Sequence, residues 1–251
     1  MRCRLLCVFW CSLALAWSQD TLPAPEWGTE VWRAPYRDSV GNAIGRFSNQ
    51  VRDIAKAPVP KEPVVFVGSS SVRAWRSLEE DFPNFPVSNS GFGGSTLPEL
   101  SFYLKELVLD KKPSMVVVYC GENDLTLAYS RPQEVFGSFL ELAGLLKQAL
   151  KKGTPVVFLS VKPSIYSWNY WEKQQQFNKM VELFDAWVDW PEFHFVRMGH
   201  LLLNDAGEPD AGLFIRDGLH LNKSGYQKWT MFLRPKLERM YKELQGPDGA
   251  K

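Results

Sequence analysis

The chain has 251 residues, of which 45% are hydrophobic and 23% charged, and its formal net charge is +1. This composition is that of an ordinary globular protein and excludes intrinsic disorder and fibrous repeats. A nearly neutral chain also lacks the basic charge that attracts nucleic acid or an anionic membrane, so we expect no nucleic-acid partner.

Residues 1–18 have the pattern of a secretory signal peptide. Arg2 and Arg4 precede an apolar run from Leu5 to Trp17, which is shorter than the roughly 20 residues that span a bilayer. Ala16 and Ser18 are small residues at positions −3 and −1 of a cleavage site after Ser18. We therefore predict a secreted chain with no stable membrane insertion after cleavage, the alternative being an uncleaved signal anchor.

The cysteines agree with this prediction. Cys3, Cys7 and Cys11 lie in the signal segment, so Cys120 alone would remain and no internal disulfide is expected. Cys120 follows an apolar segment and is predicted to be a small buried residue rather than a nucleophile. No cluster has the spacing of zinc ligands, and we expect neither a metal nor an organic cofactor.

The elements follow in chain order. Residues 19–60 predict a lead-in and a helix over 36–57 packed on the following domain, with apolar residues at helical spacing and Pro58 and Pro60 ending it. Short apolar segments predict strands at 63–67, 85–89, 115–120, 156–161 and 193–197. Amphipathic segments predict helices at 98–109, 132–151, 170–188 and 223–244. The alternation predicts an α/β fold: a three-layer α/β/α sandwich with a five-stranded parallel sheet over 61–245, before a C-terminal tail at 246–251.

Ligands of such sheets bind at the carboxyl ends of the strands, so the residues that follow each strand are the candidates for function. Gly68-Ser69-Ser70-Ser71 follows the first strand, a cluster of three glycines from Gly91 to Gly94 follows the second, and Gly121-Glu122-Asn123-Asp124 follows the third. Each motif alone is also a common turn or helix cap. A serine, backbone N–H groups and an amide at one edge are together the parts of an acyl-transfer site.

A base with its acid is found near the C-terminus. Asp217 precedes His220 by three residues, a spacing that can place a carboxylate beside an imidazole nitrogen. His194 lies between two phenylalanines in a predicted strand, and His200 has no acid at this spacing, so His200 is the weaker candidate.

These motifs resemble those of the SGNH hydrolases, also called GDSL esterases and lipases, whose blocks carry Ser, Gly, Asn and His in that order. The segments 66–75 and 161–164 are most similar to a secreted or bacterial-type branch. The resemblance implies a flavodoxin-like SGNH fold and the following site: nucleophile Ser70, oxyanion donors Ser70, Gly94 and Asn123, acid Asp217 and base His220. Ser69 stands where the family usually has Asp, which leaves the triad intact.

The implied function is hydrolysis of carboxylic esters through an acyl-serine, with a small acyl group, first an acetyl group on a carbohydrate or another alcohol. Tyr166, Trp168, Tyr170 and Trp171 are candidates for substrate binding, or for an apolar cap over the next helix. The alternatives are a lipid-directed acylhydrolase of the lysophospholipase kind and a secreted, non-catalytic binding module on the same fold. A flavodoxin-like nucleotide-binding protein would not explain the Asp217–His220 pair. The one glycosylation sequon, at Asn222, is predicted to cap the last helix instead.

Overall fold

The protein was analysed in a computed structural model, which describes residues 44–127 and 129–246. Five strands form one sheet in the order β2-β1-β3-β4-β5, and every neighbouring pair is parallel. The strands are β1 Val64–Gly68, β2 Val87–Gly91, β3 Met115–Tyr119, β4 Val156–Leu159 and β5 Phe193–Val196. The predicted parallel sheet of five strands is confirmed.

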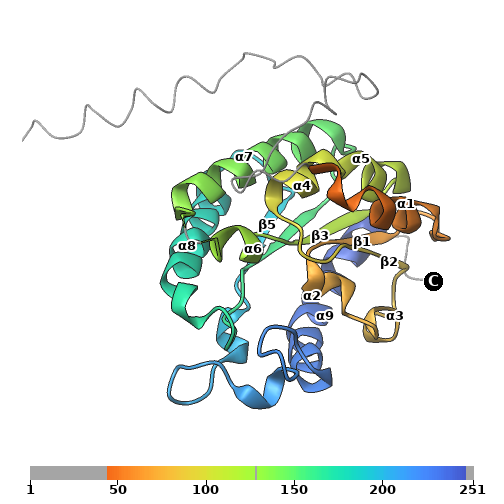
Figure 1. The fold of residues 1–251 in the computed structure, drawn as a ribbon. Coiled ribbons are helices and arrows are strands. Elements are labelled where there is room, and N and C mark those ends of the chain that lie inside the picture. Colours follow the sequence, from red (N-terminus) through yellow and green to blue (C-terminus); the bar gives the residue numbers. More distant parts are fainter. Residues whose placement is uncertain (1–43, 128, 247–251) are drawn as a thin grey trace, which may run out of the picture. The chain divides into compact units, whose positions relative to one another are not determined.

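The sheet lies between two groups of helices (Figure 1). One face is covered by α1 Ser48–Lys56, α4 Leu97–Phe102, α5 Leu104–Leu107, α7 Pro132–Ala149 and α8 Trp171–Trp187. The other is covered by α2 Ser70–Arg73, α3 Leu78–Asp81 and α9 Lys223–Gln245. A further turn, α6 Glu122–Leu125, follows β3, and single 3₁₀ turns lie at Ile44–Phe47, Leu109–Lys111, Trp168–Tyr170, Gly199–Leu202 and Ala211–Leu213. The architecture is the predicted three-layer sandwich.

Alternation along β1 divides the core in two. Val65 and Val67 belong to an apolar cluster with α4, α5 and α7, whereas Val64 and Phe66 belong to a second cluster with α9. Because both faces are covered, the whole strand is buried. Its sequence, Val64 to Val67, is therefore a continuous apolar run.

The strand register aligns the carboxyl ends of the first three strands. Gly68, the last residue of β1, is level with Gly91 of β2 and with Tyr119 of β3. The segments that follow these strands therefore begin at one edge, which is where the candidate site residues lie.

Two predicted elements needed correction. The helix expected over 98–109 is divided into α4, α5 and the 3₁₀ turn at 109–111, because the break at Tyr103 lets both Tyr103 and Leu104 be buried. The strand expected over 85–89 begins only at Val87, after Pro86, which has no N–H to donate. The strand also extends to Gly91, so Ser90 and Gly91 are part of β2 instead of following it.

The N-terminal helix is shorter in the structure than the predicted 36–57, and residues 36–43 lie outside the described part of the chain. Val51 on α1 is buried in the cluster that contains Val65, so this helix packs on the α/β core. The predicted signal peptide also lies outside the described residues. Within residues 44–127 and 129–246, no helix is both long enough and apolar enough to cross a membrane.

Candidate active site

The turn after β1 exposes one of three adjacent serines. Gly68 has φ +134°, and a Cβ there would lie 1.9 Å from the carbonyl oxygen of Tyr119, so only glycine fits. The chain then turns into α2, which begins at Ser70. Ser69 and Ser71 are each only 1% exposed, whereas Ser70 is half-buried. Ser70 is therefore the serine of this turn that a ligand can approach.

The glycine loop after β2 holds its glycines for different reasons. Gly94 has φ +80°, a left-handed conformation that other residues rarely adopt. Gly91 leaves room for the backbone of α2, because a Cβ there would lie 2.2 Å from the backbone nitrogen of Arg73. Among the residues that the structure describes, none accepts a hydrogen bond from the N–H of Ser70 or Gly94. Both donors are free to receive an oxyanion.

Contacts from two other elements hold this loop. Arg46, just before α1, donates to the Gly94 carbonyl oxygen at 3.2 Å and pairs with Glu99 at 2.8 Å. Glu99 is fully buried and also accepts hydrogen bonds from the backbone N–H and hydroxyl of Thr96, both at 2.9 Å, in a capping box. The conformation of Gly94 thus depends on Arg46, which lies some fifty residues earlier in the chain.

The Asn123 turn is joined to the same loop. Asn123 Nδ2 donates to the Ser95 carbonyl oxygen at 2.8 Å, which orients the amide and leaves its second N–H for another acceptor. The next residue, Asp124, accepts from the Leu97 N–H at 3.0 Å. Burial raises the pKa of Asp124 to about 7, and the backbone hydrogen bonds that it accepts only partly oppose this rise.

Asp217 and His220 form the predicted pair. His220 Nδ1 lies 2.6 Å from Asp217 Oδ2, and Asp217 Oδ1 accepts from the N–H groups of Leu219 and His220, each at 2.9 Å. Partial burial raises the pKa of Asp217, but the hydrogen bonds from His220 and Leu219 outweigh it and lower the pKa to about 2. His220 Nε2 is buried and has no partner among the described residues, Ser70 included. The bond to Asp217 therefore leaves Nε2 as the nitrogen that can accept a proton.

Tyr226, in the first turn of α9, connects these parts. Its hydroxyl donates to the Ser71 carbonyl oxygen at 2.8 Å, so α9 is tied to the turn that carries Ser70. Burial raises the pKa of Tyr226, and the charges of Asp217 and Glu122 raise it further. The serine turn is thus joined to α9, which begins three residues after His220.

A buried ion pair behind the site was missed by sequence reasoning. Lys162 Nζ lies 3.0 Å from both carboxylate oxygens of Glu122, and Tyr119 donates to Glu122 at 2.8 Å. Both members of the pair are at most 5% exposed. A lysine between Val161 and Pro163 at the end of an apolar strand was the signal in the sequence, because an unpaired lysine is rarely buried.

The four candidate aromatic residues make different contacts. Tyr166 is exposed, and its N–H donates to the Gly218 carbonyl oxygen, which places it on the Asp217–His220 loop. Trp168 stacks on Trp171 with ring centroids 6.0 Å apart, and Trp171 packs against Gly199. Tyr170 contacts Lys173 on α8. Tyr166 is thus in contact with the loop that carries the acid and base.

The structure also places the other residues that the sequence singled out. Cys120 is buried, as predicted, and burial raises the pKa of its thiol well above the usual range. Asn222 caps α9 by accepting from the Gly225 N–H, and its Nδ2 donates to carbonyl oxygens, at 2.8 Å for Gly212. His194 is half-buried in β5, and the exposed His200 packs edge-on against Phe232. In the described ranges, no group of three or more His, Cys, Asp or Glu side chains is arranged to hold a metal ion.

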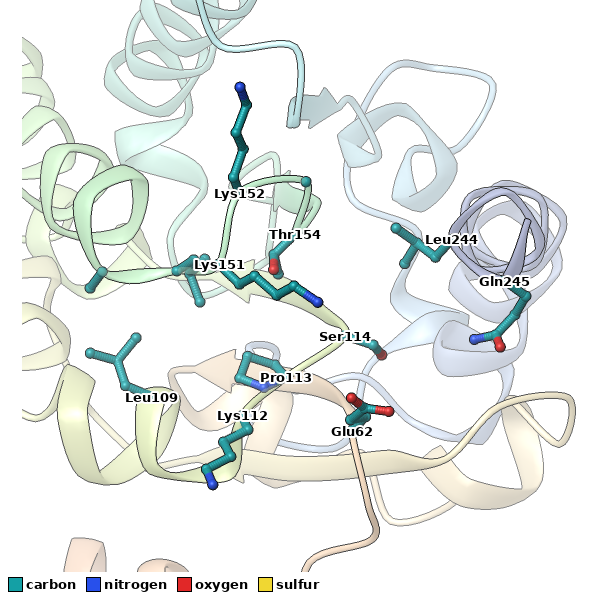
Figure 2. Close-up of a pocket in the computed structure, with 13 residues that line it drawn as sticks. Glu62, Leu109, Lys112, Pro113, Ser114, Lys151, Lys152, Thr154, Leu244 and Gln245 are labelled. Carbon is teal, nitrogen blue, oxygen red and sulfur yellow. The ribbon is translucent and has the colours of Figure 1, made fainter. Parts of the chain in front are cut away.

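A hollow is present at the opposite edge of the sheet (Figure 2). Glu62, Ser114 and Thr154, which precede β1, β3 and β4, line it, and the exposed side chains of Lys112 and Lys152 stand around it. These residues precede the strands, so the hollow lies at the amino ends of the sheet and is separate from the Ser70 edge. Ligands of parallel sheets bind at the other edge, at the carboxyl ends.

Comparison with known proteins gives the family of this chain. A model of the GDSL-like lipase/acylhydrolase family matches residues 65–228, more than half of the chain. The chain therefore belongs to this family of SGNH hydrolases, and it is a carboxylic ester hydrolase. No curated protein sequence matches it.

Solved structures show the same architecture at low sequence identity. A protein from Streptococcus pneumonia named as a platelet activating factor is 20% identical, with a TM-score of 0.66 over 76% of this chain and 91% of that one. A GDSL-like lipase from Bacteroides thetaiotaomicron is 19% identical, with a TM-score of 0.63 over 78% and 98%. An acetylxylan esterase from Geobacillus stearothermophilus is 16% identical, with a TM-score of 0.56 over 70% and 94%. At these identities the similarity extends to the fold alone.

Proposed function

We propose that this protein is a secreted serine esterase that removes small acyl groups through an acyl-enzyme on Ser70. The observation that carries the proposal is the His220 imidazole, whose Nδ1 is bound to Asp217 while its buried Nε2 has no partner within residues 44–127 and 129–246. The N–H groups of Ser70 and Gly94, which bind no acceptor in the same ranges, support it.

The proposed reaction follows from these positions. Ser70 Oγ attacks the ester carbonyl, and His220 Nε2 takes the hydroxyl proton while Asp217 stabilises the imidazolium. The developing oxyanion accepts hydrogen bonds from Ser70 N–H, Gly94 N–H and Asn123 Nδ2. His220 then protonates the leaving alcohol, and a water molecule repeats the sequence to release the acid and free Ser70.

A small acyl group, first acetyl on a carbohydrate or another alcohol, is the proposed substrate class. The fold is shared with an acetylxylan esterase, and the exposed Tyr166 ring beside the Asp217–His220 loop can stack on a sugar. The domain proposed to do this work spans residues 61–245, with α1 packed on it.

A lipid ester is the second candidate, and a specific observation favours it. Ile165, Tyr166 and Ile215 are 47%, 66% and 49% exposed. Ile165 packs on Gly218, and the Ile215 N–H bonds to the His220 carbonyl oxygen, so all three border the same loop. Exposed apolar side chains grouped in this way suit an acyl chain or an amphiphile surface.

The test is hydrolysis of 4-nitrophenyl acetate, butyrate and octanoate by the purified chain. Ser70→Ala and His220→Ala should each lose at least about 10³-fold in kcat, whereas His200→Ala, with its exposed imidazole, should keep the activity of the unmodified protein. Ser69→Ala and Ser71→Ala separate the three serines. Full activity in Ser70→Ala would disprove the assignment, and a preference for octanoate would favour the lipid candidate.

Secretion is tested separately. The full chain is expressed in a eukaryotic cell, and the N-terminus of the protein in the medium is sequenced. We expect it to begin at Gln19. Protein that stays membrane-bound with residues 1–18 attached would instead indicate an uncleaved anchor.

A further inference from the structure

Arg73 is an arginine of the candidate active site that the proposed reaction does not use. It lies three residues after Ser70 in the same helical turn, and side chains at this spacing share one face. It is exposed, and in the part of the chain that the structure describes its guanidinium has no hydrogen bond, ion pair or aromatic partner.

The guanidinium occupies a place that the glycine loop leaves for it. A Cβ at Gly93 would lie 2.8 Å from Arg73 Nε and 2.9 Å from Cζ and one terminal nitrogen. Gly93 is not in the left-handed region, so its backbone conformation does not itself require glycine. The missing side chain at position 93 instead lets the guanidinium lie against the loop, next to Gly94 and its free N–H.

Carboxylates on the surrounding loops do not neutralise this charge. Each of them has another partner in the structure: Asp217 has His220, Glu122 has Lys162, Glu99 has Arg46, and Asp124 has the Leu97 N–H. The edge that carries Ser70 therefore presents a cation that no described residue pairs, beside the glycine loop. A planar guanidinium in this position is suited to bind a carboxylate, sulfate or phosphate through two parallel hydrogen bonds.

We propose that Arg73 is a specificity residue that binds a negatively charged group of the substrate next to the ester that Ser70 attacks. The inference rests on the proposed esterase function and narrows it to anionic esters. The anionic group can belong to the acyl part or to the alcohol part, and the experiment distinguishes the two.

Matched pairs of esters test the proposal. The acyl-side pair is 4-nitrophenyl hemisuccinate and its neutral methyl ester, and the alcohol-side pair is 4-acetoxybenzenesulfonate and neutral 4-(methylsulfonyl)phenyl acetate. We expect kcat/KM to favour the anionic member of one pair by about tenfold or more, as a charged hydrogen bond would provide. Arg73→Gln should abolish this preference and leave the neutral esters unaffected. Arg76→Gln, which removes an exposed arginine one turn further on, should retain it.

The possible outcomes separate this inference from the function on which it rests. Ser70-dependent hydrolysis of the neutral esters, with an anionic-to-neutral ratio unchanged in Arg73→Gln, would overturn the role of Arg73 and leave the esterase in place. If no ester is hydrolysed, calorimetric titration of 4-nitrophenyl hemisuccinate and, separately, of 4-acetoxybenzenesulfonate into Ser70→Ala decides. Binding of either anion at least about tenfold weaker in Ser70→Ala/Arg73→Gln would support the anion site, and equal or absent binding of both would overturn it.

Discussion

The two halves of the candidate site are held in different ways. The oxyanion half, which contains Gly94 and Asn123, is fixed by contacts between segments far apart in the sequence, such as Arg46 with the Gly94 carbonyl. The acid–base half is fixed locally, because Asp217 binds both the ring and the N–H of a residue three positions later. A local device can be recognised in a sequence, whereas a long-range one has to be found in the fold.

Because the oxyanion half depends on long-range contacts, the site needs residues outside the segment that matches the family. The family match begins at residue 65, yet Arg46, which holds Gly94, lies before it. The turn that leads into α1 is thus joined to the oxyanion loop by a side chain. We expect the oxyanion half to be more sensitive to distant changes than the acid–base half.

Removal of the Asp217 charge should have the largest effect. We expect Asp217→Asn to lower kcat by about 10⁴-fold without loss of the fold, since the amide favours the wrong imidazole tautomer. Because the pKa of Asp217 is about 2, its carboxylate stays ionised at all pH values above about 4. The acid limb of the pH–rate profile therefore should not report this group. Asp205→Asn, on an exposed loop, is the control, and an Asp217→Asn enzyme with unchanged kcat would refute the local half of the site.

The buried pair beneath both halves should determine stability more than rate. Lys162→Met leaves the Glu122 carboxylate buried without its counter-ion, so we expect the free energy of unfolding to fall by about 3–5 kcal/mol. Lys162→Met/Glu122→Gln should recover part of this loss, because the uncompensated charge is gone. Denaturant unfolding measures both variants. Lys179→Met, which breaks the exposed contact with Glu182, is the control and should change little.

Sequence reasoning predicted the sheet well because parallel strands buried on both faces are continuous apolar runs, as in Val64 to Val67. It also predicted the Asp217–His220 pair, which needs no knowledge of the fold. The break at Tyr103 was missed because apolar residues at helical spacing continue through it. Arg46 and Arg73 were missed for another reason: an arginine on a polar helix face has the same pattern whether it is solvated or lies against a loop.

The long-range half is tested most directly at Arg46. Arg46→Met removes the hydrogen bond to the Gly94 carbonyl and the partner of the buried Glu99. We expect kcat to fall about tenfold with KM nearly unchanged, since the Gly94 N–H is then held less well toward the oxyanion. Arg52→Met, at an exposed position of the following helix α1, should be neutral. A rise in KM with constant kcat would instead place Arg46 in substrate binding.

The last prediction concerns stability and pH at Asp124, which joins the Asn123 turn to the start of α4. Its pKa is about 7 in the folded protein, above the ordinary value of 3.8. Between these values the folded state binds a proton that the unfolded state has lost, so stability decreases as pH rises, by at most about 1.4 kcal/mol per pH unit. Asp124→Asn cannot titrate, and its amide oxygen can still accept from the Leu97 N–H. We therefore expect the unfolding free energy of the variant, relative to the unmodified protein, to increase from pH 5 to pH 7 and then to level off.

Asp53→Asn, on the exposed face of α1, should follow the unmodified protein at every pH. If the unfolding free energies of Asp124→Asn and of the unmodified protein change in parallel with pH, Asp124 is already ionised in the folded protein. The oxyanion half would then contain a buried carboxylate that no cation pairs in the described residues.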